Sequence, residues 1–462
     1  MAIVSSFIVP HPPLIIPEIG RGEERKIQKT IDAYHSIAKQ ISEIKPDTII
    51  ITTPHSIMYS DYIHISPGKG AKGSFREFGH RDVAMEAEYD VELIGDILKE
   101  AEKEGVSAGT LGEKNSSLDH GVMVPLYFVN KYYNDYKLVR ISISGLSYLE
   151  HYKFGKCIKR AAETARNKKI VFIGSGDLSH MLKETGPYGF REEGPVFDRE
   201  VTKAMETGNF LEFLKFDEGF CESAAECGLR SFIIMAGALD GKELSSKLLS
   251  YEGPFGVGYA VAEFKVLGDS EGRRFDEIYV NSEMDRIESL KQEEDEYVRL
   301  ARQTLESYVI NRKVIKKPDN LSPELIKTKA GVFVSLKLDG SLRGCIGTIS
   351  PTTSSIADEI IRNAISAGVE DPRFPPVSED ELSRLEYSVD VLGEAEKIES
   401  IDGLNPERYG VIVTRGHRRG LLLPNLEGVD TAEEQVSIAL RKADISPSEN
   451  YQLERFEVVR HK

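Results

Sequence analysis

Short apolar runs alternate with longer amphipathic segments through the first 270 residues of the chain. Runs of strand length occupy residues 3–9, 48–53, 136–143 and 169–174, and the run 251–266 ends in one more. Between them, residues 22–45, 84–105 and 148–166 have the length and composition typical of helices. This alternation predicts an α/β fold with a mostly parallel sheet that is flanked by helices on both faces.

The pattern changes after residue 267. Residues 268–274 are rich in glycine and charge, which favours a linker, and we place the domain boundary between Gly268 and Asp285. A charged helix is expected over 285–307. Further strands are expected over 331–337 and 409–413, with a helix over 355–367. The sequence therefore predicts two domains, 1–268 and a smaller one, 285–462.

Two glycine clusters invite comparison with nucleotide-binding loops. Residues 68–73 lack the Gly-Lys-Ser/Thr ending of a phosphate-binding loop, and residues 253–258 precede a strand where a dinucleotide loop would follow one. Both clusters are expected to be turns.

Composition narrows the class of protein. The chain has 462 residues, 40% hydrophobic and 29% charged, which is typical of globular domains. A formal net charge of −16 argues against general nucleic-acid binding and against attraction to an anionic membrane. No apolar run has the length of a membrane span, which is about 18 residues. Four scattered cysteines without a Cys-x-x-Cys motif favour a reducing cytoplasm.

The candidate chemistry lies in histidine motifs. His11 and His55 each follow a predicted strand, and ligands of open α/β sheets bind beyond the carboxyl ends of strands. Two histidines with a carboxylate or a thiolate can hold one divalent metal, and Glu226-Cys227 supplies both kinds of third ligand. His120 and His180 would remain for proton transfer. A single histidine is more often a surface or core residue, so spacing alone leaves the metal site open.

Several motifs carry a specific resemblance. Residues 117–126, Ser-Leu-Asp-His-Gly-Val-Met-Val-Pro-Leu, are similar to the signature of the LigB superfamily of class III extradiol ring-cleavage dioxygenases, which includes the Memo proteins. The early His-Pro-Pro, the Pro-His after the second strand and the segment 174–180 stand in the expected order. The resemblance covers the whole first domain.

The resemblance implies roles for the site residues. His11 and His55 would bind the metal, His180 would act as acid and base, and His120 would contact substrate or oxygen. The third ligand is a glutamate in the dioxygenases and a cysteine in Memo proteins. Here the register fits Cys227 better than Glu226. A carboxylate would suit Fe(II), the metal that the family implies, whereas a thiolate would suit Zn(II).

The second domain resembles the AMMECR family. Its hallmark is Leu-Arg-Gly-Cys-Ile-Gly-Thr at 342–348, supported by Asp-Pro-Arg-Phe at 371–374 and by the segment 419–424. This resemblance implies a smaller α+β domain. The fusion of both domains resembles proteins of the AmmeMemoRadiSam system, which implies a radical-SAM protein partner.

Cys345 and Arg343 of the hallmark motif are further candidates. Cys345 could be a nucleophile, with His417 the only histidine nearby in the sequence, or a small core residue. Arg343 could bind an anion or a partner together with Arg415, Arg418 and Arg419.

Two functions from different classes follow. The first is a metal-dependent, extradiol-dioxygenase-like oxidoreductase that acts on a small aromatic substrate and O₂. The alternative is a non-catalytic Memo-like protein that binds a metal or a partner. The sequence leaves the substrate, the metal and the oligomeric state open.

Overall fold

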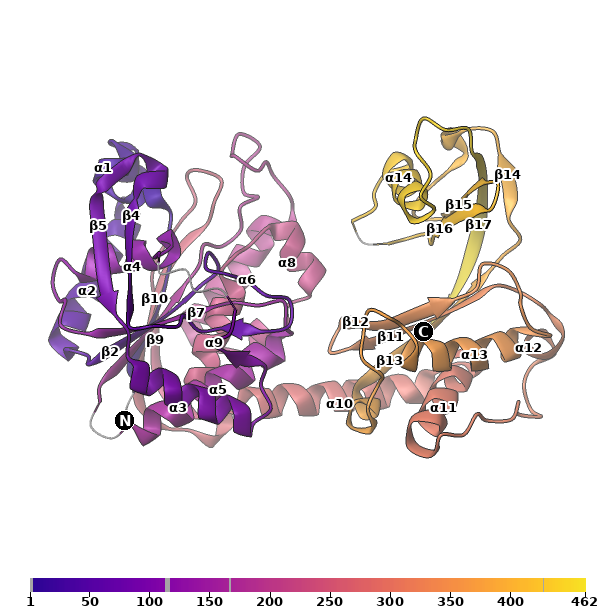
Figure 1. Cartoon of the computed structure of the whole chain (residues 1–462), viewed down its shortest axis with the longest axis horizontal. Helices are drawn as coiled ribbons and strands as arrows, with labels where there is room; N and C mark the ends of the chain where they lie inside the picture. Colours follow the sequence, from indigo (N-terminus) through magenta and orange to yellow (C-terminus); the bar gives the residue numbers. More distant parts are fainter. Residues whose placement is uncertain (1–2, 113–116, 166–167, 427) are drawn as a thin grey trace. The chain divides into compact units, whose positions relative to one another are not determined.

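The computed structural model describes residues 3–112, 117–165, 168–426 and 428–462. They form two compact units, Met1–Val280 and Asn281–Lys462, and the boundary falls within helix α10 (Figure 1). In the described part of the chain, no helix is both long and apolar enough to cross a membrane.

The first unit is built on a six-stranded sheet in the order β7-β2-β8-β1-β10-β9. Its strands are β1 (Ile3–Val9), β2 (Thr48–Thr53), β7 (Lys137–Ser142), β8 (Ile170–Ser175), β9 (Lys242–Glu252) and β10 (Tyr259–Asp269). Four strands are parallel, but β10 pairs antiparallel with both β1 and β9. The sheet is therefore mixed, and the expectation of a mostly parallel sheet holds only for one side of it. The turn at 253–258 joins β9 to β10, and this hairpin makes the antiparallel edge.

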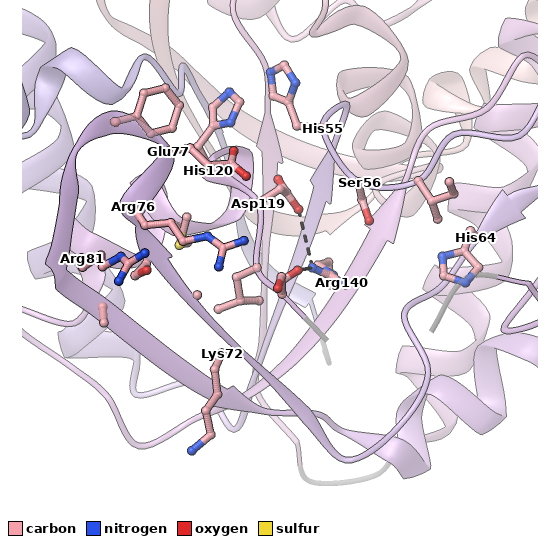
Figure 2. A pocket seen from close by; sticks show the side chains of 18 residues that line it. His55, Ser56, His64, Lys72, Arg76, Glu77, Arg81, Asp119, His120 and Arg140 are labelled. Atoms are coloured by element: carbon pink, nitrogen blue, oxygen red, sulfur yellow. Dashed lines mark hydrogen bonds and ion pairs between the residues drawn. The ribbon is translucent and has the colours of Figure 1, made fainter. Parts of the chain in front are cut away.

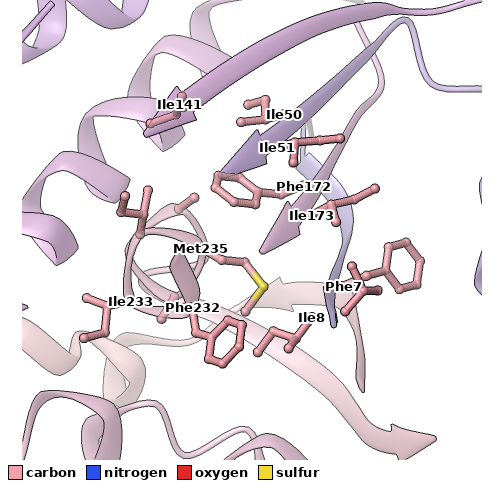
Figure 3. Packing of buried hydrophobic residues seen from close by; sticks show 14 of the residues in the cluster. Phe7, Ile8, Ile50, Ile51, Ile141, Phe172, Ile173, Phe232, Ile233 and Met235 are labelled. Carbon is pink, nitrogen blue, oxygen red and sulfur yellow. The ribbon is translucent and has the colours of Figure 1, made fainter. Parts of the chain in front are cut away.

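Helices cover this sheet. The longer ones are α2 (Gln28–Ile44), α3 (Val91–Lys103), α4 (His120–Val129), α5 (Tyr148–Thr164), α6 (Glu193–Thr207) and α9 (Leu229–Ala238), and the short ones are α1 (Pro17–Gly20), α7 (Leu211–Leu214) and α8 (Glu218–Ala224). Helix α9 packs on β8, and Phe232, Ile8 and Phe172 are fully buried in one apolar cluster (Figure 3). This apolar core fixes the ends of the strands that carry the candidate site.

The hairpin of β4 (Gly70–Phe75) and β5 (His80–Glu88) departs from the sequence prediction. Residues 84–88 were expected to begin a helix, and residues 68–73 to be a turn. Instead, β5 runs through Glu88, Gly73 pairs with Met85, and the helix begins only at Val91. The residues Ala-Met-Glu-Ala-Glu have high helix propensity, but pairing with β4 overrides it. Two short strands, β3 (Ile63–His64) and β6 (Ala108–Gly109), pair nearby.

The stretch predicted as a linker has regular structure. Gly268 lies in β10, and α10 (Phe275–Glu293) follows after a short turn of 3₁₀ helix. The charged helix expected over 285–307 is two helices, α10 and α11 (Glu296–Asn311), because Asp295 caps the start of α11 by accepting hydrogen bonds from the backbone of Tyr297 and Val298.

The second unit is an antiparallel sheet with helices, as an α+β domain would be. Its strands are β11 (Val332–Leu338), β12 (Ser341–Gly347), β13 (Leu385–Leu392), β14 (Glu396–Ile398), β15 (Tyr409–Arg415), β16 (Arg418–Leu422) and β17 (Gln452–His461). Its further helices are α12 (Pro323–Lys327), α13 (Ile356–Val369) and α14 (Ala432–Lys442). Helix α13 packs on β11 and on α11 around a buried apolar cluster.

Candidate metal centre

Three histidines from separate segments meet at the carboxyl end of the parallel strands. His11 follows β1, His55 follows β2, and His120 is the first residue of α4. One ring nitrogen of each lies within 4.8 Å of those of the other two. The Nε2 atoms of His11 and His55 are 2.9 Å apart. The structure thus brings together three imidazole donors that are far apart in the sequence.

Close backbone approach makes this meeting possible. A Cβ atom on Gly121 would lie 2.3 Å from Thr53 Oγ1, so only glycine lets the start of α4 approach the end of β2. Asp119 reinforces the contact, because its carboxylate accepts hydrogen bonds from Thr53 Oγ1 at 2.7 Å and from the backbone N–H of Val122 at 3.2 Å. His120 is therefore held against His55, with ring centroids 4.0 Å apart.

A second close approach brings the thiol to the site. A Cβ on Gly176 would lie 2.1 Å from Gly228 Cα, so the loop after β8 and the loop before α9 touch. Cys227 Sγ lies 3.7 Å from His11 Nε2 and donates to the carbonyl of Asp177 at 3.7 Å. The Asp177 carboxylate in turn accepts a hydrogen bond from the backbone N–H of His11 at 2.7 Å.

The adjacent Glu226 is engaged elsewhere. Its carboxylate accepts a hydrogen bond of 2.7 Å from the backbone N–H of Leu229, the first residue of α9. A carboxylate at the positive end of a helix is favourably placed there. Of the two third-ligand candidates, the structure therefore places Cys227 beside His11 and Glu226 at the start of α9.

His180 flanks the cluster from the loop after β8. Its Nδ1 lies 2.5 Å from the carbonyl of Ala225, which orients the ring, and its ring meets that of Tyr188 edge-on. His11 Nδ1 is similarly oriented by Ser175 Oγ at 3.0 Å, which leaves its Nε2 for the site. Such a contact to one ring nitrogen is how proteins fix which nitrogen of a metal-binding histidine is free.

Burial lowers the pKa values of the four site histidines. It lowers the pKa of His11 well below the ordinary value, with further lowering from the neighbouring histidines. Removal of its ring from solvent lowers the pKa of His55 to about 4, although the residue keeps an exposed edge. Burial also lowers the pKa values of His120 and His180. All four rings are thus neutral near pH 7, the form that binds a metal.

The acids and the thiol shift in the opposite direction. Burial, aided by the charges of Asp177 and Glu226, raises the pKa of the Cys227 thiol well above its ordinary value. Burial raises the pKa of Asp177 to about 7. Without a cation in the cluster the thiol is therefore protonated, and a bound divalent metal would supply the charge that stabilises a thiolate.

A pocket of about 880 Å³ opens beside the histidines (Figure 2). His55, His120 and Phe78 line it, and the β4–β5 hairpin forms a wall that carries Arg76 and Arg81. The sequence prediction missed this hairpin and its arginines, because the segment was expected to be a turn followed by a helix. It also missed Asp177, although the strand-end rule that selected His11 applies to this residue two positions after β8.

The candidates of the second unit lie in a different environment. Cys345 is on β12 opposite Ser335, whose hydroxyl lies 3.2 Å from the thiol, and its backbone N–H donates to Asp371 at 2.9 Å. Burial raises the pKa of the Cys345 thiol. Within the described residues, no hydrogen bond joins it to His417. Arg343 forms an ion pair of 2.7 Å with Glu381.

The other arginines proposed for an anion or partner site are also paired. Arg415 and Arg418 both pair with Glu449, and Arg419 lies 3.5 Å from Glu454.

Comparison with known proteins agrees with this architecture. Residues 5–262 match the family model described as the catalytic LigB subunit of aromatic ring-opening dioxygenase, and residues 298–461 match the AMMECR1 model. A protein of Clostridium acetobutylicum is 46% identical over the full length of both chains. A protein of Thermotoga maritima is 51% identical over 37% of this chain and 98% of its own.

Solved structures show weaker likeness. An uncharacterised protein of Pyrococcus horikoshii is 35% identical, with a TM-score of 0.34, over 36% of this chain and 88% of its own. An uncharacterised protein of Escherichia coli K12 is 13% identical, with a TM-score of 0.38, over 56% of this chain and 99% of its own. The match over residues 5–262 and the full-length relative decide the family. The chain belongs to the LigB family of aromatic ring-opening dioxygenase catalytic subunits and carries an AMMECR1 domain after its LigB domain.

Proposed function

We propose that the protein is a metal-dependent oxidoreductase of the extradiol-dioxygenase type, acting on a catechol-like substrate and O₂. The observation that supports this most is the cluster of His11, His55 and His120 at the mouth of a pocket, in a chain of the LigB family. Each neutral imidazole offers one unprotonated nitrogen, and three ring nitrogens within 4.8 Å of one another can converge on a single divalent metal.

The donor atoms of these residues also fit a divalent metal. His11 and His55 would hold the metal, with Cys227 as the third ligand and His120 facing the substrate side, where it lines the pocket. When bound, the metal would supply Lewis acidity for a catechol hydroxyl and a redox centre for O₂; Fe(II) is the metal of this proposal and Zn(II) the alternative.

The protein's own residues then handle orientation and protons. His180, held by the carbonyl of Ala225, would take a proton from a substrate hydroxyl and return it later. Phe78, whose ring lies 5.5 Å from that of His120, would confine an aromatic substrate against the histidine and exclude water from one face.

Oxygen uptake tests this proposal. Protein reconstituted with Fe(II) without air should consume O₂ with at least one member of a broad catechol panel. His180→Ala should then lower kcat about 10²- to 10⁴-fold, the usual contribution of a general acid or base. Absence of uptake across the panel, at full iron occupancy, would refute catalysis.

One observation favours a second function. Cys227 lies beside His11 while Glu226 caps α9, and a thiolate ligand suits Zn(II) or Cu(I) better than O₂ chemistry at Fe(II). The second proposal is therefore a metal- or partner-binding protein without turnover. A zinc-loaded protein without oxygen uptake would support it. A radical-SAM protein partner remains a prediction for either function.

A further inference from the structure

The pocket beside the histidines has a cationic wall. Arg76, in the short 3₁₀ turn Arg76–Phe78, and Arg81, in β5, line it from the hairpin, and Arg140 of β7 lines it from the sheet (Figure 2). The whole chain has a formal net charge of −16, so this concentration of positive charge is local. A cationic wall in an acidic protein indicates an anionic ligand.

Not all of these cations are free to meet a ligand. Lys72 also lines the pocket but forms an ion pair of 2.6 Å with Glu86, and Figure 2 shows it pointing away from the histidines. Arg140 donates to the carbonyl of Ser117 at 2.6 Å and lies 3.7 Å from Asp119. These two cations are already partly neutralised.

Arg76 and Arg81 differ from them. Both are exposed, and in the described part of the chain the side chain of neither has a hydrogen bond or an ion pair. The pocket's carboxylates are Glu77 and Asp119; Asp119 Oδ1 accepts hydrogen bonds from Thr53 and from the start of α4, and its Oδ2 lies 3.7 Å from Arg140. Among the described residues that line the pocket, Arg76 and Arg81 thus outnumber the one carboxylate, Glu77, that is not engaged by another side chain.

The hydrogen-bonding geometry of the guanidinium group indicates which class of anionic ligand fits. A carboxylate has two oxygens and satisfies one guanidinium fork, whereas a phosphate monoester has three oxygens and nearly two negative charges and can accept from two arginines. A pocket of about 880 Å³ also exceeds what one small ring would fill, since pockets of about 300–1,000 Å³ hold drug-sized ligands.

We propose that this pocket binds a phosphate ester, with its phosphate at Arg76 and Arg81 and its ring or other planar part between Phe78 and His120. In naming a substrate class for the histidine site, this inference rests on the proposed function; the phosphate contact itself requires neither metal nor turnover.

Isothermal titration calorimetry on the full-length, metal-free protein tests the phosphate contact with three matched probes: phenyl phosphate, benzoate and phenol. Phenyl phosphate should bind most tightly, and its affinity should fall as salt rises from 50 to 500 mM, because the arginines are exposed. Arg76→Gln and Arg81→Gln should each weaken phenyl phosphate about tenfold, the usual scale for loss of a charge-assisted hydrogen bond.

Arg25→Gln is the control. It removes the same charge from an exposed position that is not among the pocket residues, and it should leave the affinity unchanged. Circular dichroism of each variant verifies the fold, which substitution of an exposed side chain should not disturb.

The outcomes separate cleanly. Equal affinity for benzoate and phenyl phosphate, or wild-type affinity in both hairpin variants, would overturn the proposal. Arginine-dependent phosphate binding without oxygen uptake on catechols would support the pocket assignment and count against the proposed function only. Oxygen uptake on neutral catechols with no arginine-dependent phosphate binding would support the proposed function and overturn the phosphate assignment.

Discussion

Metal binding should release one proton, and Cys227 should be its source. The rings of His11 and His55 are neutral above pH 7, because burial holds their pKa values well below that, and they lose no proton when they bind. Asp177, with its pKa raised to about 7, is largely ionised above pH 7.5. The thiol, with its pKa raised by burial, is still protonated at pH 8.5 and must lose its proton to become a ligand.

The magnitude follows from this proton count. Between pH 7.5 and 8.5, one released proton makes the apparent Zn²⁺ affinity rise about tenfold per pH unit, or about 1.4 kcal/mol. Cys227→Ser should abolish that slope as well as weaken binding, because a serine hydroxyl does not ionise in this range. Glu226→Gln should keep the slope, since its carboxylate faces the backbone N–H of Leu229.

Competition titration with a chelator of known affinity measures the slope. Calorimetry in two buffers of different ionisation enthalpy counts the proton independently. Cys345→Ser, which removes a thiol from the second unit, is the matched control and should behave like wild type. A flat wild-type profile, or a slope that survives Cys227→Ser, would refute the assignment of Cys227 as the ligand.

Two further predictions concern stability. Gly121→Ala would place a Cβ 2.3 Å from Thr53 Oγ1 and should lower the free energy of unfolding in urea by about 1–3 kcal/mol. Gly95→Ala is the control, because its Cβ would meet no neighbouring segment within 4 Å, and it should not destabilise the protein. Equal effects of the two substitutions would contradict the close-approach argument. Burial raises the pKa of the Asp198 carboxyl to about 7, against about 3.9 in the unfolded chain. The folded state therefore binds this proton more tightly, and the free energy of unfolding falls as pH rises between these two values, by at most about 4 kcal/mol. Asp198→Asn should flatten this decline in urea midpoints from pH 4 to 7, and an unchanged profile would contradict it.

Hydrophobic patterning along the chain was enough to locate the elements that build the first sheet. The run at 48–53 is a strand because six apolar or β-branched residues in succession can be buried on both faces of a sheet. In the strand at 137–142, Leu138, Val139 and Ile141 supply the buried apolar positions. The same reasoning failed at residues 84–88, where local propensity favours a helix and pairing with β4 makes a strand. Patterning also did not show how far β10 extends, because Gly268 and Asp269 belong to the strand only through pairing with Glu243 and Lys242 of β9.

The sequence by itself determined which residues could carry chemistry: histidines after strands, and a Glu-Cys pair before a helix. Only the tertiary structure decided which atoms meet. Strand order brings His11 and His55 to the same carboxyl end of the parallel strands. The close contact at Gly121 adds His120 to them, and the contact of Gly176 with Gly228 brings Cys227 beside His11. Such meetings depend on pairing and close packing between segments more than 100 residues apart in some cases, and local periodicity does not encode these.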